Sequence, residues 1–161
     1  MPFVAMAPAV TGTIASSSEY NKVVANVNQL NTTRTKYKMA RATGSSSAVS
    51  TSVADLPGAT VNVTTVETNT EVKVTAVFDI ESTNTDIFVG TLVVNGGAAQ
   101  NGEAHYTGAG GRATVTQQWT VTLPTAATHT LKLRTQKVGA LGTMNIYGVH
   151  SCILVEGQGI T

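Results

Sequence analysis

The chain carries little charge. Of its 161 residues only 12% are Asp, Glu, Lys or Arg, about half of the usual share, and the net charge is +1. Thr, Ser, Asn and Gln fill the polar positions instead. Without a basic excess the chain cannot neutralise many phosphates, so we expect no nucleic-acid partner. So little charge also protects a surface poorly against association, which favours a protein whose surface is covered by neighbours.

Cysteines and long apolar runs are scarce as well. Cys152 is the single cysteine, so no disulfide can form within the chain, and its place in the apolar run 149–155 predicts a buried, inert thiol. No apolar run is long enough to span a bilayer, so we expect no membrane partner. Residues 1–10 lack the leading basic residues of a signal peptide. Synthesis and folding in a cytoplasm are therefore expected.

Motifs for catalysis and for metal binding are missing too. The sequence has no Gly-x-Ser-x-Gly elbow, and residues 108–112 lack the Lys-Ser/Thr ending of a phosphate loop. His105, His129 and His150 lie far apart and have no further ligand at a metal-binding spacing, although His129 and His150 could face each other across adjacent strands. We expect no metal, no cofactor and no enzymatic activity.

One pair of acids has a spacing that could serve catalysis. Asp79 and Glu81 lie two residues apart, on one face of a predicted strand. This spacing suggests the two carboxyl groups of a glycosidase. General acid catalysis needs a desolvated carboxyl group, and nothing in the surrounding sequence indicates one. We interpret both as members of a solvated strand face.

Alternation of apolar and polar residues is what the chain has in abundance. Within 71–81 every second residue is apolar and the residues between are polar, with Val77 as the exception. This period of two is typical of a strand buried on one face. Residues 113–123 repeat the pattern, with Trp119 on the apolar face. We predict further strands at 37–42, 59–66, 86–94, 128–135 and 144–156.

Two stretches between these strands are predicted to be loops. Residues 49–58 are rich in Ser, close on Pro57-Gly58 and are expected to be a loop with a short edge strand. Residues 98–111 are too rich in Gly for a helix and are expected to be a long exposed loop with a short strand around His105. Seven or eight short strands without interleaved helices predict an all-β fold, an antiparallel jelly-roll-like sandwich over residues 36–161.

The N-terminal residues follow neither strand nor helix periodicity at first. Residues 1–15 mix small, apolar and Pro residues, which predicts an extended arm, and Ser16 to Glu19 is a capping box that starts a short helix over 16–31. Spacings of three and four residues place the helix's apolar side chains on one stripe: Tyr20, Val23, Val24, Val27 and Leu30. The stripe either packs on its own β domain or forms the seam of a bundle of three symmetry-related helices.

The order of segments resembles a known family. The run Trp-Thr-Val-Thr-Leu-Pro at 119–124, the run Thr-His-Thr-Leu-Lys-Leu-Arg-Thr at 128–135 and the last predicted strand look like the C-terminal half of small virion structural proteins of tailed bacteriophages. Residues 14–30 look like the N-terminal segment of those proteins. The family comprises capsid decoration and fibre-head proteins with a β-sandwich of the tumour-necrosis-factor or C1q kind, and the loose patterns extend over half of the chain.

The resemblance implies a trimeric capsid decoration protein that binds the outer capsid surface of a virion and stabilises it, without enzymatic activity. Its implied partners are two further copies of the chain, as a homotrimer, and the major capsid protein or another virion protein, after synthesis in the host cytoplasm. A fibre head would carry a long coiled coil or a Gly-x-y repeat, and neither is present, which favours decoration. The residues of the arm that would anchor it to the capsid are Phe3, Val4, Met6, Val10 and Ile14.

A rival interpretation keeps the fold and changes the task. In it the chain is the receptor-binding or carbohydrate-binding head of a phage tail fibre. The contact would come from the loop 98–111 with Tyr106, or from Trp119 stacking on a sugar. For Trp119, a place in the core is the commoner role of such a residue.

Overall fold

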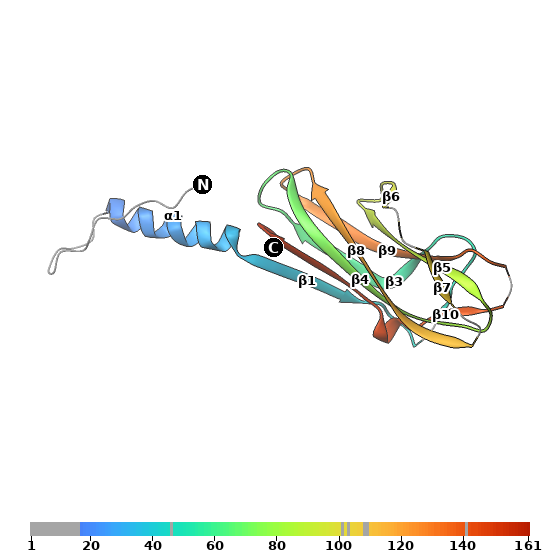
Figure 1. Ribbon diagram of the computed structural model, residues 1–161. Helices are drawn as coiled ribbons and strands as arrows, with labels where there is room; N and C mark the ends of the chain where they lie inside the picture. The colour runs from blue at the N-terminus through green and yellow to red at the C-terminus, as the bar shows by residue number, and fades with distance from the viewer. Residues whose placement is uncertain (1–16, 46, 101, 103, 108–109, 141) are drawn as a thin grey trace.

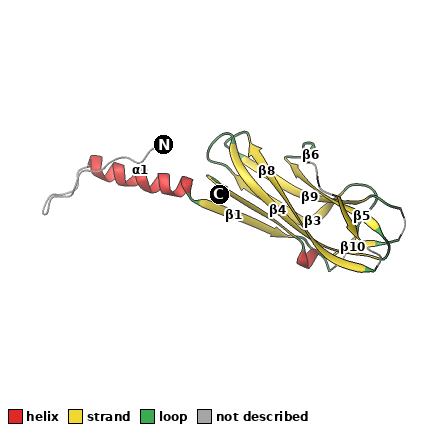
Figure 2. Cartoon of the chain, viewed as in Figure 1, coloured by secondary structure: helices red, strands yellow, loops and turns green. Residues whose placement is uncertain are grey.

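The computed structural model describes residues 17–45, 47–100, 102, 104–107, 110–140 and 142–161. They form one helix, followed by two antiparallel sheets that pack face to face (Figure 1). Figure 2 shows how far strand outweighs helix. The predicted all-β class, a jelly-roll-like sandwich preceded by one helix, is confirmed. The predicted arm 1–15, with its proposed anchoring residues, and Ser16 of the capping box lie outside the described residues.

Helix α1 (Ser17–Thr33) stands away from the sandwich (Figure 1). It confirms the predicted helix and extends it to Thr33. Arg34 then leads into β1 (Thr35–Arg41), the first strand of the head, whose prediction at 37–42 is also confirmed. Within the described part of the chain, no helix is long and apolar enough to cross a membrane.

The first sheet is built around β4 (Thr70–Ser82), the strand whose alternation is the clearest in the sequence. β8 pairs with β4 along its whole length on one side, from Thr70 opposite Leu123 to Ser82 opposite Gly111. On the other side β11 and then β10 pair with it, and β1 lies beyond β11 at the edge of the sheet. The remaining bounds in this sheet are β8 (Gly111–Leu123), β11 (Cys152–Gln158), β10 (Met144–Ile146) and β2 (Ser47–Ala48).

The second sheet has β9 in its middle, between β3 and β5. Two short strands, β6 and β7, pair with the other edge of β5. The bounds are β3 (Ala54–Thr64), β5 (Asp86–Val94), β6 (Ala99–Gln100), β7 (Ala104–Thr107) and β9 (Thr128–Lys137).

The core lies between the two sheets. The alternating apolar residues of β4, from Val72 to Ile80, are buried, as the period of two requires. Phe78 of β4 meets Phe88 of β5 with 5.1 Å between ring centroids, a tilted arrangement that aromatic pairs favour. Gly90 makes room for this contact, because a Cβ atom there would lie 2.6 Å from the Phe78 ring. Each buried side chain of this size contributes about 1.5–3 kcal/mol to folding.

The short edge strand expected within the loop 49–58 is present at its end and continues into the strand predicted at 59–66. Residues 54–64 form β3, which pairs with β9 through a break in register between Asp55 and Thr60. Pro57 and Gly58 lie in this irregular stretch, where a missing N–H group and a φ of +78° are tolerated. The carbonyl of Pro57 accepts a hydrogen bond of 2.8 Å from the N–H group of Thr43. Pro-Gly here marks a bulge and not the end of a loop.

The single last strand predicted at 144–156 is wrong. Between Ile146 and Cys152 the chain advances six residues, while β4 advances only the three from Ile80 to Val77. The excess is taken up by a 3₁₀ turn, η1 (Gly148–His150), which separates β10 from β11. Gly148 fits against the carbonyl of Thr43, where a Cβ atom would come within 2.5 Å. Periodicity did not reveal this interruption because the flanking residues are all apolar or neutral.

The short strand predicted around His105 is confirmed as β7, which pairs with β5. The stretch 98–111 also contains β6, a second short strand on β5 that was not predicted. Gly102 lets the chain pass close to β5, since a Cβ atom there would lie 1.7 Å from the carbonyl oxygen of Gly90. After the last strand, Ile160 is fully buried and bridges to Thr65.

Candidate functional site

The apolar stripe of α1 is exposed along its whole length. The exposed fractions are 67% for Tyr20, 50% for Val27 and 57% for Leu30, and Val23 and Val24 are exposed as well. Because residues three and four apart share one face of a helix, these five side chains form one continuous apolar surface. The interpretation in which the stripe packs on its own β domain is therefore wrong. The helix bundle stays a prediction.

A helix in this position lacks the contacts that normally stabilise helices. A 17-residue helix is marginal on its own in water, and most of the stability of a helix in a protein comes from packing its apolar face. Its local contacts include the pairing of Lys22 with Glu19 at 2.9 Å and a hydrogen bond of 2.9 Å from the Thr33 hydroxyl to the carbonyl of Gln29. A contiguous exposed apolar surface of this kind marks an interaction site.

The exposed apolar surface continues along the chain into β1. Tyr37 is 74% exposed and Met39 is 54% exposed. They alternate with Ala40, which packs against the core, so they belong to the outer face of the first sheet. Leu154 of β11 lies opposite Met39 and is half-buried. The edge of the sheet next to α1 is thus apolar on its outer face.

Positive charge is concentrated on the same segment. Between Glu19 and Asp55 the sequence has no acidic residue, and Arg34, Lys36 and Lys38 follow one another at every second position. Within the described ranges none of these three cations has an ion pair. We call these three residues the basic segment. The sequence signal of this segment is the absence of acidic residues from 20–54, which the low charge of the whole chain makes easy to overlook.

A groove lies beside the C-terminal end of α1. Its volume is about 500 Å³, and its lining is formed by Gln29 and Thr33 of α1, by residues 67–71 and by Gln158-Gly159. Two exposed carboxylates lie at its rim: Glu67 from the turn between β3 and β4, and Glu71 from the start of β4. Neither carboxylate has an ion pair among the residues that the structure describes. We call Glu67 and Glu71 the acidic turn.

A polar network occupies the outer face of the first sheet at the other end of β4. Arg112 of β8 donates two hydrogen bonds to Asp79, from Nε at 3.0 Å and from Nη2 at 2.6 Å. Its guanidinium also lies over the Tyr147 ring, 4.0 Å from the centroid, and the Tyr147 hydroxyl donates to Glu81. The hydrogen bonds and then the charge of Arg112 hold the pKa of Asp79 below its usual value.

Asp79 and Glu81, the acids with a possible catalytic spacing, both belong to this network. General acid catalysis needs a carboxyl group with a raised pKa, and the pKa of Asp79 is lowered. The hydrogen bond to Glu81 raises the pKa of the Tyr147 hydroxyl, so that group keeps its proton and continues to donate. The network ties the turn before β11 to the middle of the sheet. Its geometry is that of a structural clamp.

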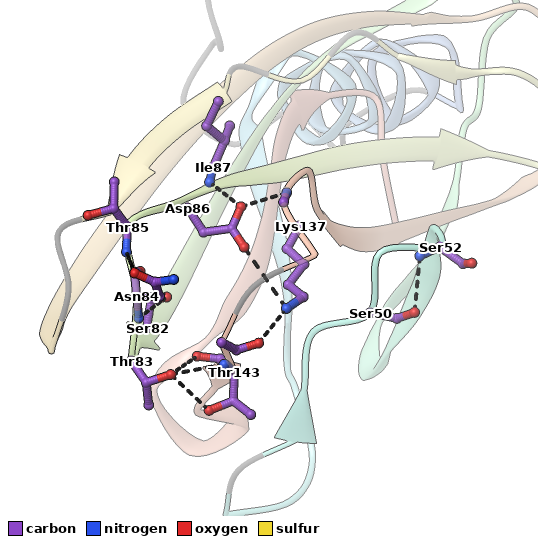
Figure 3. A network of polar contacts seen from close by, with 12 residues as sticks. Ser50, Ser52, Ser82, Thr83, Asn84, Thr85, Asp86, Ile87, Lys137 and Thr143 are labelled. Atoms are coloured by element: carbon purple, nitrogen blue, oxygen red, sulfur yellow. Dashed lines mark hydrogen bonds and ion pairs between the residues drawn. The ribbon is translucent and has the colours of Figure 1, made fainter.

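A second polar network lies at the strand ends on the far side of the head (Figure 3). The carboxylate of Asp86 accepts from the N–H groups of Ile87 and Gly139, both at 2.7 Å. Lys137 lies 4.0 Å from Asp86 and donates to the carbonyl of Gly142 at 2.7 Å. Both charged side chains are buried, and burying a charge is tolerated when it is paired and hydrogen-bonded. The network fixes the turn after β9.

The histidines do not come together. His129 is buried in β9, where Asn95 lies 2.9 Å from Nδ1 and the carbonyl of Thr125 lies 2.9 Å from Nε2. His150 is exposed in η1, at the edge of the other sheet. The possibility that these two face each other across adjacent strands is therefore wrong. Among the described residues no group of three or more His, Cys, Asp or Glu could hold a metal ion.

The remaining candidate residues lie apart from the stripe. Trp119 of β8 is opposite Val74 and packs, half-buried, against the core. Tyr106 belongs to β7 and lies opposite Ile87 in the register. Their role as ligand contacts stays a prediction. Cys152 is half-buried at the start of β11, so the prediction of a fully buried thiol is too strong.

Comparisons with known proteins show little beyond this architecture. No family model and no curated protein matches the chain. Among solved structures, a family 35 carbohydrate-binding module from an environmental isolate is 18% identical, with a TM-score of 0.44, over 77% of this chain and 96% of the module. A chain of infectious bursal disease virus, Gt strain, is 14% identical, with a TM-score of 0.45, over 99% of this chain.

This chain spans only 43% of the length of that virus chain. The enzymatically active domain of bacteriophage CBA120 tailspike protein 4 is 13% identical, with a TM-score of 0.32, over 80% of this chain and 20% of its own. Likenesses at these identities and scores indicate no function. The exposed stripe, the basic segment and the acidic turn are the features of this chain that indicate a function.

Proposed function

We propose that this protein is a non-enzymatic structural component of a virion, a capsid decoration protein that assembles as a homotrimer through α1. In the assembly three helices bury their stripes against one another and the three β heads lie around the same axis. The arm 1–15 reaches to the major capsid protein or another virion protein. Binding across the outer capsid surface then stabilises the shell.

The observation that carries this proposal is the exposed stripe from Tyr20 to Leu30. A helix that leaves five large apolar side chains in water while its own head packs a complete core is one that needs a partner outside the chain. Parallel helices related by a three-fold axis bury such a stripe as a coiled-coil seam. The neutral, Thr-rich surface of the head also suits a crowded assembly.

The first test is the mass of the purified protein in solution, measured by light scattering over a range of concentrations. We expect a mass of three chains. The variant Val27→Asp places a charge in the middle of the stripe and should reduce the mass to one chain, because a buried unpaired charge is costly. The matched control, Asn28→Asp, adds the same charge at the neighbouring helix position, outside the stripe, and should remain a trimer. A monomeric wild-type protein would contradict the homotrimer.

The second test concerns the arm. A variant without residues 1–15 should keep the unfolding midpoint of the intact protein and should lose binding to capsids in a sedimentation assay. If the shortened protein binds capsids as well as the intact one, the arm has no anchoring role. A glycan array tests the rival function. Specific binding that disappears in Tyr106→Ala would favour a carbohydrate-binding head over a purely structural one.

A further inference from the structure

The charges of this chain fall into two classes, those with an ion pair inside the chain and those without one. Among the described residues the carboxylates of Glu19, Asp55, Asp79 and Asp86 all have cationic partners. In a chain with only 12% charged residues, these pairs use four of the acids and five of the cations. The charges that are left over are therefore informative.

The leftover cations are concentrated, with one leftover acid, Glu156, opposite Tyr37 in the register. Four of the five cations without an ion pair in the described part of the chain lie on one stretch: Arg34, Lys36, Lys38 and Arg41, with Lys73 as the fifth. Arg41 donates to the carbonyl of Val149 at 3.2 Å. The basic segment thus keeps three cations for a partner, at the foot of α1. Lysines on an edge strand also discourage aggregation, but that role does not require any acidic counterpart.

An acidic counterpart does exist, on the rim of the groove beside the same helix end. The acidic turn is held in a defined shape, because Asn69 has a φ of +54° and the Thr70 hydroxyl donates to the carbonyl of Glu67 at 2.8 Å. Gln29 and Thr33, one turn before the basic segment, form the opposite wall of the groove. Both charged elements therefore flank the junction of α1 and β1.

We propose that the acidic groove of one copy binds the basic segment of the neighbouring copy in the trimer. This inference depends on the proposed assembly through α1 and specifies its second contact. Around a three-fold axis each interface joins two different patches, so one chain must present both a basic and an acidic patch. Packing three α1 helices together also brings three copies of their C-terminal ends to one axis, where each acidic turn can meet the next chain's basic segment.

The contact has a role that the apolar stripe cannot fill. A seam of Val and Leu side chains permits several registers and orientations, whereas opposite charges at its foot favour the one in which Glu67 and Glu71 meet Arg34 and Lys36. Charge complementarity of this kind adds more to specificity than to affinity. The groove of about 500 Å³ leaves room for a long cationic side chain to enter from outside.

The test is a charge exchange measured by the concentration at which the trimer dissociates. We expect the double variant Arg34→Glu with Lys36→Glu, and separately Glu67→Arg with Glu71→Lys, each to dissociate at concentrations about tenfold higher or more than the wild type. The protein carrying all four changes should return to within about threefold of the wild type, because reversed pairs attract again. Lys73→Glu, which alters an exposed cation outside both elements, is the control and should leave dissociation unchanged.

Several outcomes would overturn this contact. One is that both double variants dissociate like the wild type; another is that the four-fold variant dissociates as readily as either double variant. Basic-segment variants that remain trimers but no longer bind capsids would assign the segment to an acidic partner of another kind. Circular dichroism and an unchanged unfolding midpoint control for folding, since all four positions lie on the surface.

The same measurements separate this contact from the proposed assembly. A wild-type monomer contradicts both. A trimer that Val27→Asp dissociates and the charge variants do not contradicts the charge contact alone.

Discussion

β4 and α1 are both amphipathic, but only β4 finds its apolar partners within the chain. The apolar side of β4 is covered by the second sheet, and even its buried Asp79 is matched by Arg112. The apolar side of α1 is covered by nothing in the described structure. The basic segment that follows it has no ion pair among the described residues. The head is thus a complete folding unit, whereas the segment 17–41 carries the features of an interface. Four substitutions test this contrast.

The largest effect is expected from Phe78→Ala in β4. Removing a fully buried aromatic side chain that packs on Phe88 leaves a cavity and should cost about 3–5 kcal/mol of unfolding free energy. Urea unfolding followed by tryptophan fluorescence measures the loss. Val77→Ala, on the half-buried outer face of the same strand, is the control and should cost much less. Equal losses would mean that β4 is not buried on one side only.

A smaller loss is expected from Gly90→Ala in β5. The added methyl group would lie 2.6 Å from the Phe78 ring and must displace it. Overpacking of this kind typically costs about 1–3 kcal/mol. The double variant Gly90→Ala with Phe78→Leu should recover part of the loss, because the smaller side chain frees space. No recovery would show that the strain arises elsewhere.

Arg112→Gln should have an effect that depends on pH. Arg112 lowers the pKa of Asp79 in the folded state, so the pair contributes stability that is present above the unfolded-state pKa, about 4, and is lost as pH falls through the folded-state value. The stability difference between wild type and variant should be largest near neutral pH and should shrink below about pH 4. Urea unfolding at several pH values measures it. A difference that grows on acidification would contradict the clamp.

The smallest effect on the folded head is expected from Leu30→Ala in α1. At concentrations where the protein is dissociated, the head's unfolding free energy should change by less than about 0.5 kcal/mol, because Leu30 contacts solvent. The same substitution should weaken trimer formation. Asn28→Ala, at an exposed helix position outside the stripe and the groove, serves as the control for assembly. A loss of several kcal/mol in the dissociated protein would mean that α1 packs on the head after all.

Regular alternation made much of the head predictable. β4, β8 and β9 begin and end within a few residues of their predicted bounds, because in each of them a period of two coincides with burial on one face. β5 was predictable from a nearly continuous apolar run. The errors occur where a single residue decides the backbone. Pro57-Gly58 looks like a turn and is a bulge, and Gly148 begins a turn inside an apolar run. Such contacts depend on segments distant in sequence.

The candidate site also combines features that the sequence predicts with features that only the fold reveals. The residues of the stripe follow from helical periodicity, but whether the stripe was covered could be learned only from the fold. The basic segment is a local pattern of three residues, whereas the acidic turn gains its meaning from the groove that Gln29 and Thr33 form with residues 67–71. The pairing of Asp79 with Arg112 joins positions 33 residues apart and needs the register of β4 and β8.

By itself the sequence determined the class of fold, the helix and its apolar stripe, since side-chain period and backbone geometry are properties of neighbouring residues. Tertiary structure alone decided that this stripe remains exposed, that unpaired charges of opposite sign flank the end of α1, and that the acids of β4 belong to a clamp. Each of these depends on which distant segments meet. Contacts between distant segments are stabilised by burial and charge pairing across the whole chain. A local sequence pattern does not specify these contacts.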